Sequence, residues 1–194
     1  MTPFSVLQVC MGNICRSPMA ERLFVLALGE HAELVYSHSA GTGGWHQGNP
    51  MNPPAARQVL ARGGDDSGFG ARQLVAGHVE ASDLILTATT EQYDYVLSMC
   101  PDAAPRTFVL GQFGRLLTGH ASELPAFSGD ADSLYARGIA LVKALDGARG
   151  GSRPVPGDDL EDPYGLSEAT YTRIADEIES TIKPLAAKLT RTDT

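Results

Sequence analysis

Cysteine, basic residues and long apolar runs are all scarce in this sequence. Its 194 residues include three cysteines, at positions 10, 15 and 100, an odd number too small for a disulfide framework. Lysine and arginine total 15 against 23 acidic residues, a formal charge of −8, which argues against the basic surface that nucleic acids and anionic membranes require. No apolar run approaches the roughly 20 residues of a membrane span, and residues 1–10 lack the basic start of a signal peptide. We therefore expect a cytoplasmic protein with no membrane or nucleic-acid partner.

The length and the apolar pattern predict one α/β domain covering residues 1–194, because domains average roughly 150 residues. Short apolar runs predict strands at 4–9, 35–39, 83–87 and 107–110. Helical spacing predicts helices at 17–29, 53–62, 90–99 and from about 167. Alternating strands and helices indicate a four-stranded parallel sheet with helices on both faces, in three layers. Residues 63–70 and 146–162 read as loops, and Pro184 should kink or end the last helix.

The segment after the first predicted strand, residues 10–17, carries the chemistry. It joins a strand to a helix start, where Ser17 is expected to cap the helix and Pro18 to occupy its first position. Successive backbone N–H groups in such a loop form an anion-binding nest, and the same field stabilises a thiolate at Cys10. Arg16 adds a planar fork that matches two oxygens of a tetrahedral oxyanion. The pattern predicts a phosphate-binding loop with a nucleophile beneath it.

Residues 9–21, VCMGNICRSPMAE, closely resemble the signature of the low-molecular-weight protein tyrosine phosphatases. Later segments agree in order, namely 39–42 with Trp45, 71–73, 83–86 and 162–165. The resemblance implies that Cys10 attacks phosphorus to form a phosphocysteine and that Arg16 clamps the phosphate oxygens. It also implies that Asp162 protonates the leaving phenolate and then activates water, the role reversal expected of a general acid.

The resemblance further implies a set of supporting residues. Ser39 would support the loop, together with Asn13 and Ser17. Contacts with the phosphate or the aryl ring would come from Met11, Gly12, Asn13, Ile14, Cys15, Ser17, Trp45 and Tyr164. No cofactor is implied, and the five histidines show no metal-ligand spacing. The implied partner is a phosphotyrosine-containing protein, such as a tyrosine kinase, and the protein is expected to act as a monomer.

The sequence departs from the family pattern in three places. The family often has a histidine shortly before the segment at 71–73, whereas this chain has Phe69 and Gly70 there. The acidic loop at 162–165 is one residue shorter than usual, and residues 111–158 form a longer segment than in compact members. The sequence assigns that segment no role.

Several alternatives stay open. An arsenate reductase of the same fold could use the loop with an external thiol, since only Cys100 is available as a further internal one. A protein-arginine-phosphatase branch characteristically has threonine at the position of Ile14, so the apolar side chain here favours a flat aryl substrate. A binding module that only reads phosphate would need neither the thiol nor the acid. We also expect Cys15 to form a reversible disulfide with Cys10.

Overall fold

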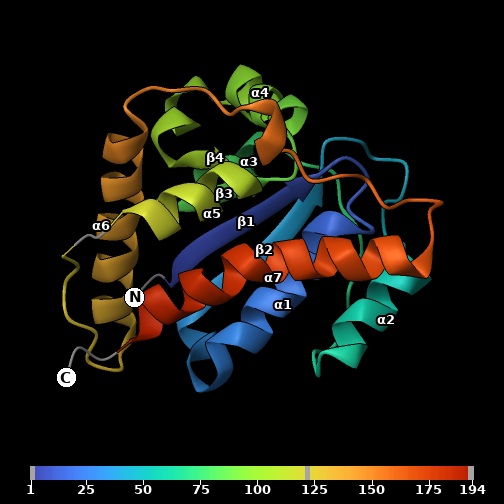
Figure 1. Ribbon diagram of the computed structural model, residues 1–194, viewed down its shortest axis with the longest axis horizontal. Helices are drawn as coiled ribbons and strands as arrows, with labels where there is room; N and C mark the ends of the chain where they lie inside the picture. The colour runs from blue at the N-terminus through green and yellow to red at the C-terminus, as the bar shows by residue number, and fades with distance from the viewer. Residues whose placement is uncertain (1–2, 121–122, 192–194) are drawn as a thin grey trace.

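The computed structural model describes residues 3–120 and 123–191, and a parallel four-stranded sheet lies at its centre (Figure 1). The strands are β1 (Phe4–Cys10), β2 (Val35–Gly41), β3 (Leu84–Thr87) and β4 (Thr107–Val109). Their order is β2-β1-β3-β4, so the sheet grows outward on both sides of β1. Every neighbouring pair is parallel, which requires the chain to cross a face of the sheet between strands. The predicted fold class is confirmed.

The helices between and after these strands cover both faces of the sheet. They are α1 (Arg16–Leu28), α2 (Pro53–Ala61), α3 (Ala76–Glu80), α4 (Thr90–Met99), α5 (Leu110–Gly119), α6 (Ala131–Arg149) and α7 (Glu168–Thr190). Short 3-10 helices are η1 (Gly29–Leu34), η2 (Pro101–Arg106) and η3 (Pro156–Asp158). The predicted strands and helices agree with these bounds within two residues. No helix in the described part of the chain is long and apolar enough to cross a membrane.

Side chains of β1 point alternately into two apolar cores. Phe4 and Val6 belong to the larger core, against α1, α5 and α7, which runs alongside α1 (Figure 1). Leu7 and Val9 belong to the smaller core, which α3 and α4 cover. This period of two is what a strand buried on both faces produces. The central strand is therefore fixed from both sides, and so is the position of Cys10 at its end.

Two local expectations are wrong, and of the two outcomes expected at Pro184 the helix end is excluded. α1 begins at Arg16 with Cys15 at its N-cap, so Ser17 is not the cap and lies inside the first turn. Pro184 does not end α7, because the proline lies on the exposed side of the helix while its apolar stripe packs into the core. The carbonyl of Ser180, which loses its usual partner there, is on a solvent-exposed residue. Residues 146–149 are the last turn of α6 rather than loop.

The carboxyl ends of three strands meet at one edge of the sheet. Cys10 pairs with Gly41 at the end of β2, and Val9 pairs with Thr87 at the end of β3. The loops that follow these strands therefore start side by side. Ligands of parallel α/β sheets bind beyond this edge, and the predicted phosphate loop follows β1 there.

Candidate active site

The loop between β1 and α1 bends around the thiol of Cys10. Asn13 has a φ of 55°, the one positive value for a non-glycine among the described residues, and asparagine tolerates this left-handed conformation. Gly41 lies beside the bend, and a side chain there would meet the backbone oxygen of Met11 at 2.7 Å. The strand neighbour thus has to be glycine for the loop to close. The positive end of the 13-residue helix α1 then faces the enclosed space.

A directed chain of hydrogen bonds ends at the Cys10 sulfur. The backbone N–H of Arg72 donates to Asn13 Oδ1 over 2.9 Å, which leaves Asn13 Nδ2 as the donor to Ser17 Oγ and Ser39 Oγ at 2.9 and 2.8 Å. Ser17 Oγ accepts from Asn13, so its own hydrogen is free to donate to Cys10 Sγ, 2.9 Å away. This arrangement allows the Cys10 sulfur to accept the hydrogen bond, which is the role that a thiolate requires.

The far end of the same chain is a carboxyl group. Ser39 Oγ donates to Glu21 Oε2 over 2.5 Å, a short bond of the kind that charged acceptors make. Burial raises the pKa of Glu21, while the Ser39 bond and the charges of Arg22 and Arg72 lower it. Ser39 therefore supports the loop through Asn13 and not by contact with the site itself. Glu21 is a residue of this network that the sequence analysis quoted without giving it a role.

Arg72 supports the phosphate loop in this chain, which lacks the histidine that the family often has shortly before this segment. Its Nε donates to the carbonyl of Ser39 at 2.8 Å, in addition to the backbone bond to Asn13. Its Nη2 donates to Nδ1 of His38 at 2.8 Å, so that nitrogen carries no proton and the buried ring is neutral. Burial and the charge of Arg72 together lower the pKa of His38 to about 4. Arg72 is thus held in place by a histidine and in turn holds the loop.

Arg16 lies almost completely buried, at 4% exposure, under the opening of the nest. Its Nη1 donates to the carbonyl of Leu160 at 3.0 Å, and its Nη2 pairs with Asp162 Oδ2 at 3.1 Å. Its Nε is buried without a hydrogen-bond partner among the described residues. An unsatisfied N–H on a buried guanidinium is costly, and an oxyanion in the nest is the group that satisfies it.

The acidic loop reaches Arg16 although it is one residue short. Asp162 Oδ1 accepts from the backbone N–H of Tyr164 at 3.2 Å, and Gly165 completes the turn with a φ of 76°. The carboxyl group remains partly exposed, so it can meet a group that enters from solvent. The shorter loop therefore keeps the Asp162 carboxyl group at the mouth of the nest.

A pocket of about 190 Å³ opens over the nest. It is lined by Cys10, Met11, Gly12, Ile14, Cys15, Arg16, Trp45, His46, Asp162 and Tyr164. Nine of these ten residues were predicted, whereas the predicted residues Asn13, Ser17 and Ser39 lie buried behind the pocket. Trp45 and Tyr164 form its rim and are 72% and 59% exposed.

His46 is the pocket residue that the sequence analysis missed. Its ring lies over Gly12, where a side chain would meet Cδ2 at 3.1 Å, and it stands 6.4 Å from the ring of Tyr164. Asn49 Nδ2 lies 3.3 Å from Nδ1 of His46. Its position directly after Trp45 in the same loop was the available signal. The mouth of the pocket therefore carries three rings.

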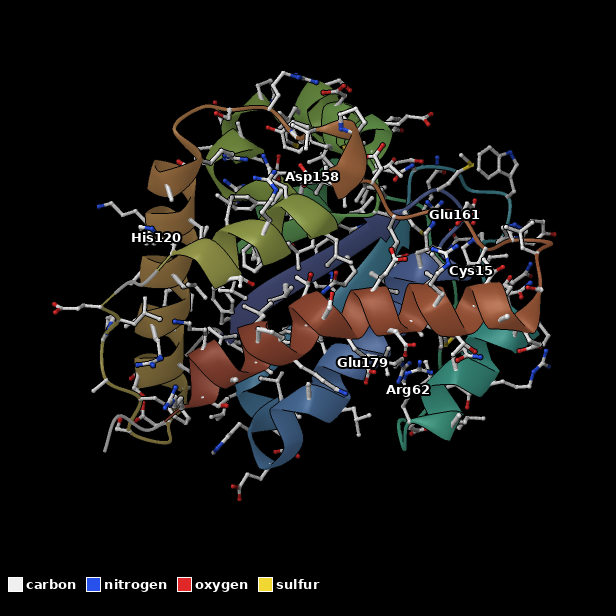
Figure 2. The ribbon with its side chains drawn as sticks, viewed as in Figure 1. Cys15, Arg62, His120, Asp158, Glu161 and Glu179 are labelled. Atoms are coloured by element: carbon white, nitrogen blue, oxygen red, sulfur yellow. The ribbon has the colours of Figure 1, made fainter. Side chains whose placement is uncertain are left out.

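Cys15 is enclosed behind the pocket and has a different environment from Cys10. Its sulfur lies 3.5 Å from the hydroxyl of Tyr171, which donates to Asn52 Oδ1 at 3.1 Å. Burial raises the pKa of the Cys15 thiol to about 12. Figure 2 shows Cys15 near the start of α1, close to α7, from which Tyr171 comes. All three cysteines are free, and the disulfide between Cys10 and Cys15 stays a prediction.

Most of the chain matches the model of one known protein family. Residues 5–145 match the model of the low-molecular-weight phosphotyrosine protein phosphatases. A low-molecular-weight protein-tyrosine-phosphatase of Bacillus subtilis is 36% identical over 130 residues, which are 66% of this chain and 75% of the relative. The low-molecular-weight protein-tyrosine phosphatase A of Mycobacterium tuberculosis is 35% identical over 148 residues, or 75% and 89%. A protein-arginine-phosphatase of Geobacillus stearothermophilus is 27% identical over 187 residues, or 96% and 97%.

Solved structures share the fold. The arginine phosphatase structure from Geobacillus stearothermophilus superposes with a TM-score of 0.67 at 24% identity and covers 96% of this chain and 93% of its own. A protein tyrosine phosphatase of Entamoeba histolytica gives a TM-score of 0.69 at 22% identity, with 96% and 95% covered. Together with the family match over more than half of its length, these findings show that the chain is a phosphatase of the low-molecular-weight phosphotyrosine protein phosphatase family.

Proposed function

We propose that this protein hydrolyses phosphotyrosine in proteins through a cysteinyl-phosphate on Cys10. The observation that carries the proposal is the 2.9 Å hydrogen bond between Ser17 Oγ and the Cys10 sulfur, beside a pocket that holds Cys10, Arg16 and Asp162. A site that only bound phosphate would need the nest and the arginine, but neither a stabilised sulfur anion nor a carboxyl group at the mouth.

In the first step, Cys10 Sγ attacks phosphorus and the bond between phosphorus and the tyrosine oxygen breaks. Arg16 leaves its pair with Asp162 for the phosphate oxygens, which the N–H groups of residues 11–15 also bind. As that pair opens, Asp162 takes up a proton from solvent and gives it to the departing phenolate oxygen. The rings of Trp45 and Tyr164 hold the aryl group in the meantime.

In the second step, water attacks the phosphorus of the cysteinyl-phosphate. Asp162, now a carboxylate, takes a proton from that water, and the bond between sulfur and phosphorus breaks. The electron pair returns to Cys10, where the Ser17 hydroxyl stabilises the regenerated thiolate. Inorganic phosphate leaves, and each atom and proton of the cycle is accounted for without a metal or cofactor.

The aryl substrate is favoured by the wall of the pocket. Ile14 presents an apolar side chain beside the nest, and the rim is aromatic. A flat ring buries apolar area against these groups, whereas a charged guanidinium loses hydration there. The partner we propose is a phosphotyrosine-containing protein such as a tyrosine kinase, met by a monomer in the cytoplasm.

Phosphoarginine is the second candidate substrate, and one observation favours it. The relative named a protein-arginine-phosphatase covers 96% of this chain, while the two tyrosine-directed relatives described above cover 66% and 75%.

Arsenate reduction would need an external thiol. Cys100 follows α4, which begins beside the end of β3 and runs back toward the opposite edge of the sheet, away from Cys10.

The test is a substrate panel with the reduced protein and its Cys10→Ala variant, without added metal. Matched peptides carrying phosphotyrosine, phosphoserine or phosphoarginine are assayed for phosphate release, and arsenate reduction is assayed with a small thiol. The proposal expects release from phosphotyrosine in preference to the others, lost in Cys10→Ala. Preferred release from phosphoarginine would replace the substrate, and arsenate turnover with little phosphotyrosine activity would refute the hydrolytic reading.

A further inference from the structure

A buried carboxyl group anchors the stem of the acidic loop. Asp158, in η3, is 4% exposed in its side chain and lies four positions before Asp162. Its Oδ1 accepts from Nε and Nη2 of Arg115 at 3.2 and 3.1 Å, and its Oδ2 accepts from Nη2 at 2.9 Å. Oδ2 also accepts from the backbone N–H of Val155 at 2.8 Å. The Arg115 fork thus holds both oxygens of a buried group, a geometry that fixes position as well as charge.

Helix α5 is shaped to receive this stem. A side chain at Gly111 would meet the backbone oxygen of Asp158 at 2.5 Å and its Cα at 2.8 Å, so only glycine allows the two segments to touch. Arg115 follows one turn later on the same helix, which places its fork over the same segment. Figure 2 shows Asp158 beside α5, and Glu161 farther along the segment toward Cys15. Both features lie in the segment 111–158 that the sequence left without a role.

The residues after Asp158 are tied to three further places in the fold. Asp159 Oδ1 accepts from the N–H and the hydroxyl of Thr90 at 2.7 and 2.8 Å. The N–H of Leu160 donates to the carbonyl of Ala88 at 2.8 Å. The carbonyl of Leu160 accepts from Arg16, which also pairs with Asp162. Asp158 is thus the first of a series of anchors that leads, within four residues, to the carboxyl group of Asp162 and to the guanidinium of Arg16.

We propose that Arg115 is a positioning residue for the phosphatase reaction: by clamping Asp158 it sets where Asp162 stands over the nest. The inference rests on the proposed role of Asp162 as the acid. It gives the longer segment 111–158 a function, which is to supply a rigid base for a loop that is one residue shorter than usual. A displacement of about 1 Å at a reacting group can cost roughly 10²-fold in rate, so a small release of the clamp is measurable.

Substrates with different leaving groups separate positioning of the acid from general damage. The tyrosine phenolate, with a pKa of about 10, needs a proton as it leaves, whereas nitrophenolate is stable without one. Arg115→Gln is therefore expected to lower kcat/KM for a phosphotyrosine peptide, which reports formation of the cysteinyl-phosphate, by about tenfold or more, up to the roughly 10² to 10⁴ of complete general-acid loss. For nitrophenyl phosphate kcat/KM should change less than about threefold, since the nest is intact and this leaving group needs no acid, whereas kcat should fall for both substrates because Asp162 is also the base for breakdown.

Two further variants and one exchange measurement test the role of the Arg115 fork. Arg115→Lys keeps the charge without the fork and should fall between wild type and Arg115→Gln. Arg153→Gln, which breaks an exposed pair with Asp94 in the same segment but leaves the Arg115–Asp158 pair in place, is the matched control and should behave as wild type. Amide hydrogen exchange at Leu160 should speed up in Arg115→Gln alone, because its bond to Ala88 depends on the stem.

Unchanged kcat/KM for both substrates in Arg115→Gln, or an equal loss of kcat/KM for both, would overturn the positioning role. Asp162→Asn keeps the two proposals apart. If Asp162→Asn leaves phosphotyrosine turnover unchanged, the proposed acid is wrong. If Asp162→Asn slows it and Arg115→Gln does not, the acid stands and only the clamp is wrong.

Discussion

Replacing Ser17 with alanine removes the one hydrogen bond that the described side chains donate to the Cys10 sulfur. The bond is 2.9 Å long and lies in the buried interior, and in the proposed mechanism its acceptor is the Cys10 thiolate. Hydrogen bonds to charged groups contribute about 1.5 to 3 kcal/mol. A factor of ten in rate corresponds to about 1.4 kcal/mol, so the loss should be about 10- to 150-fold in the step that depends on the bond.

The affected step follows from where charge develops. In the first step the thiolate gives up its charge to phosphorus, and in the second it regains that charge as the leaving group. Ser17 therefore assists the breakdown of the cysteinyl-phosphate most, and Ser17→Ala should make breakdown clearly slower than formation. Asn13 still has Ser39 as an acceptor in the variant, so the loop should keep its shape.

Rapid mixing with nitrophenyl phosphate measures the two steps separately. Ser17→Ala should release one equivalent of nitrophenolate in a fast burst, followed by a steady state about 10- to 150-fold slower than wild type. Ser39→Ala, which lies one bond farther along the chain, is the control and should show a smaller loss. A steady-state rate within threefold of wild type, or a loss with no burst, would refute the reasoning about charge on sulfur.

Three other substitutions test separate parts of the account. Because of His38, the free energy of unfolding of the protein should fall in acid. The pKa of His38 is about 4 in the folded protein and 6.5 ordinarily, so between these pH values the unfolded chain binds more protons and the folded state loses stability as the pH drops. Urea unfolding at several pH values should show a weaker dependence in His38→Gln. Gly111→Ala should lower the free energy of unfolding by about 1 to 3 kcal/mol, because its methyl group overlaps Asp158, and denaturant titration checks this. Ile14→Thr should raise the ratio of phosphoarginine to phosphotyrosine turnover, measured on matched peptides; an unchanged ratio would remove Ile14 as a selectivity residue.

The sequence predicted the parts of the molecule in which local pattern and tertiary packing agree. β1, the loop after it and α1 follow from an apolar run, a turn-forming segment and a helical stripe that all favour the same outcome. Cys10 and Arg16 were predicted from the loop pattern and Asp162 from the resemblance, and the structure brings the three together in one pocket. Their catalytic roles remain proposals.

Contacts between distant segments were beyond the sequence. Arg72 reaches Ser39 and His38 across strands, and no local spacing links these residues. Arg115 pairs with Asp158, 43 positions later in the sequence. The three glycines of α5 weaken the helical pattern there, so the sequence did not predict this helix. Ser17 looked like a cap because serine before proline is typical of helix starts, but its hydroxyl is used by Cys10. At Ser17 the contact with Cys10 takes precedence over the residue's local preference for a helix cap.

The most direct test of the central claim is to trap the intermediate. Asp162→Asn with nitrophenyl phosphate should form the cysteinyl-phosphate at a normal rate, since that leaving group needs no acid, and break it down slowly, since the base is gone. The mixture is quenched, digested and analysed by mass spectrometry, with Cys10→Ala as the control. The account predicts one phosphate on the peptide that carries Cys10, absent from the control. Phosphate release in wild type with no phosphate ever found on Cys10 would contradict it.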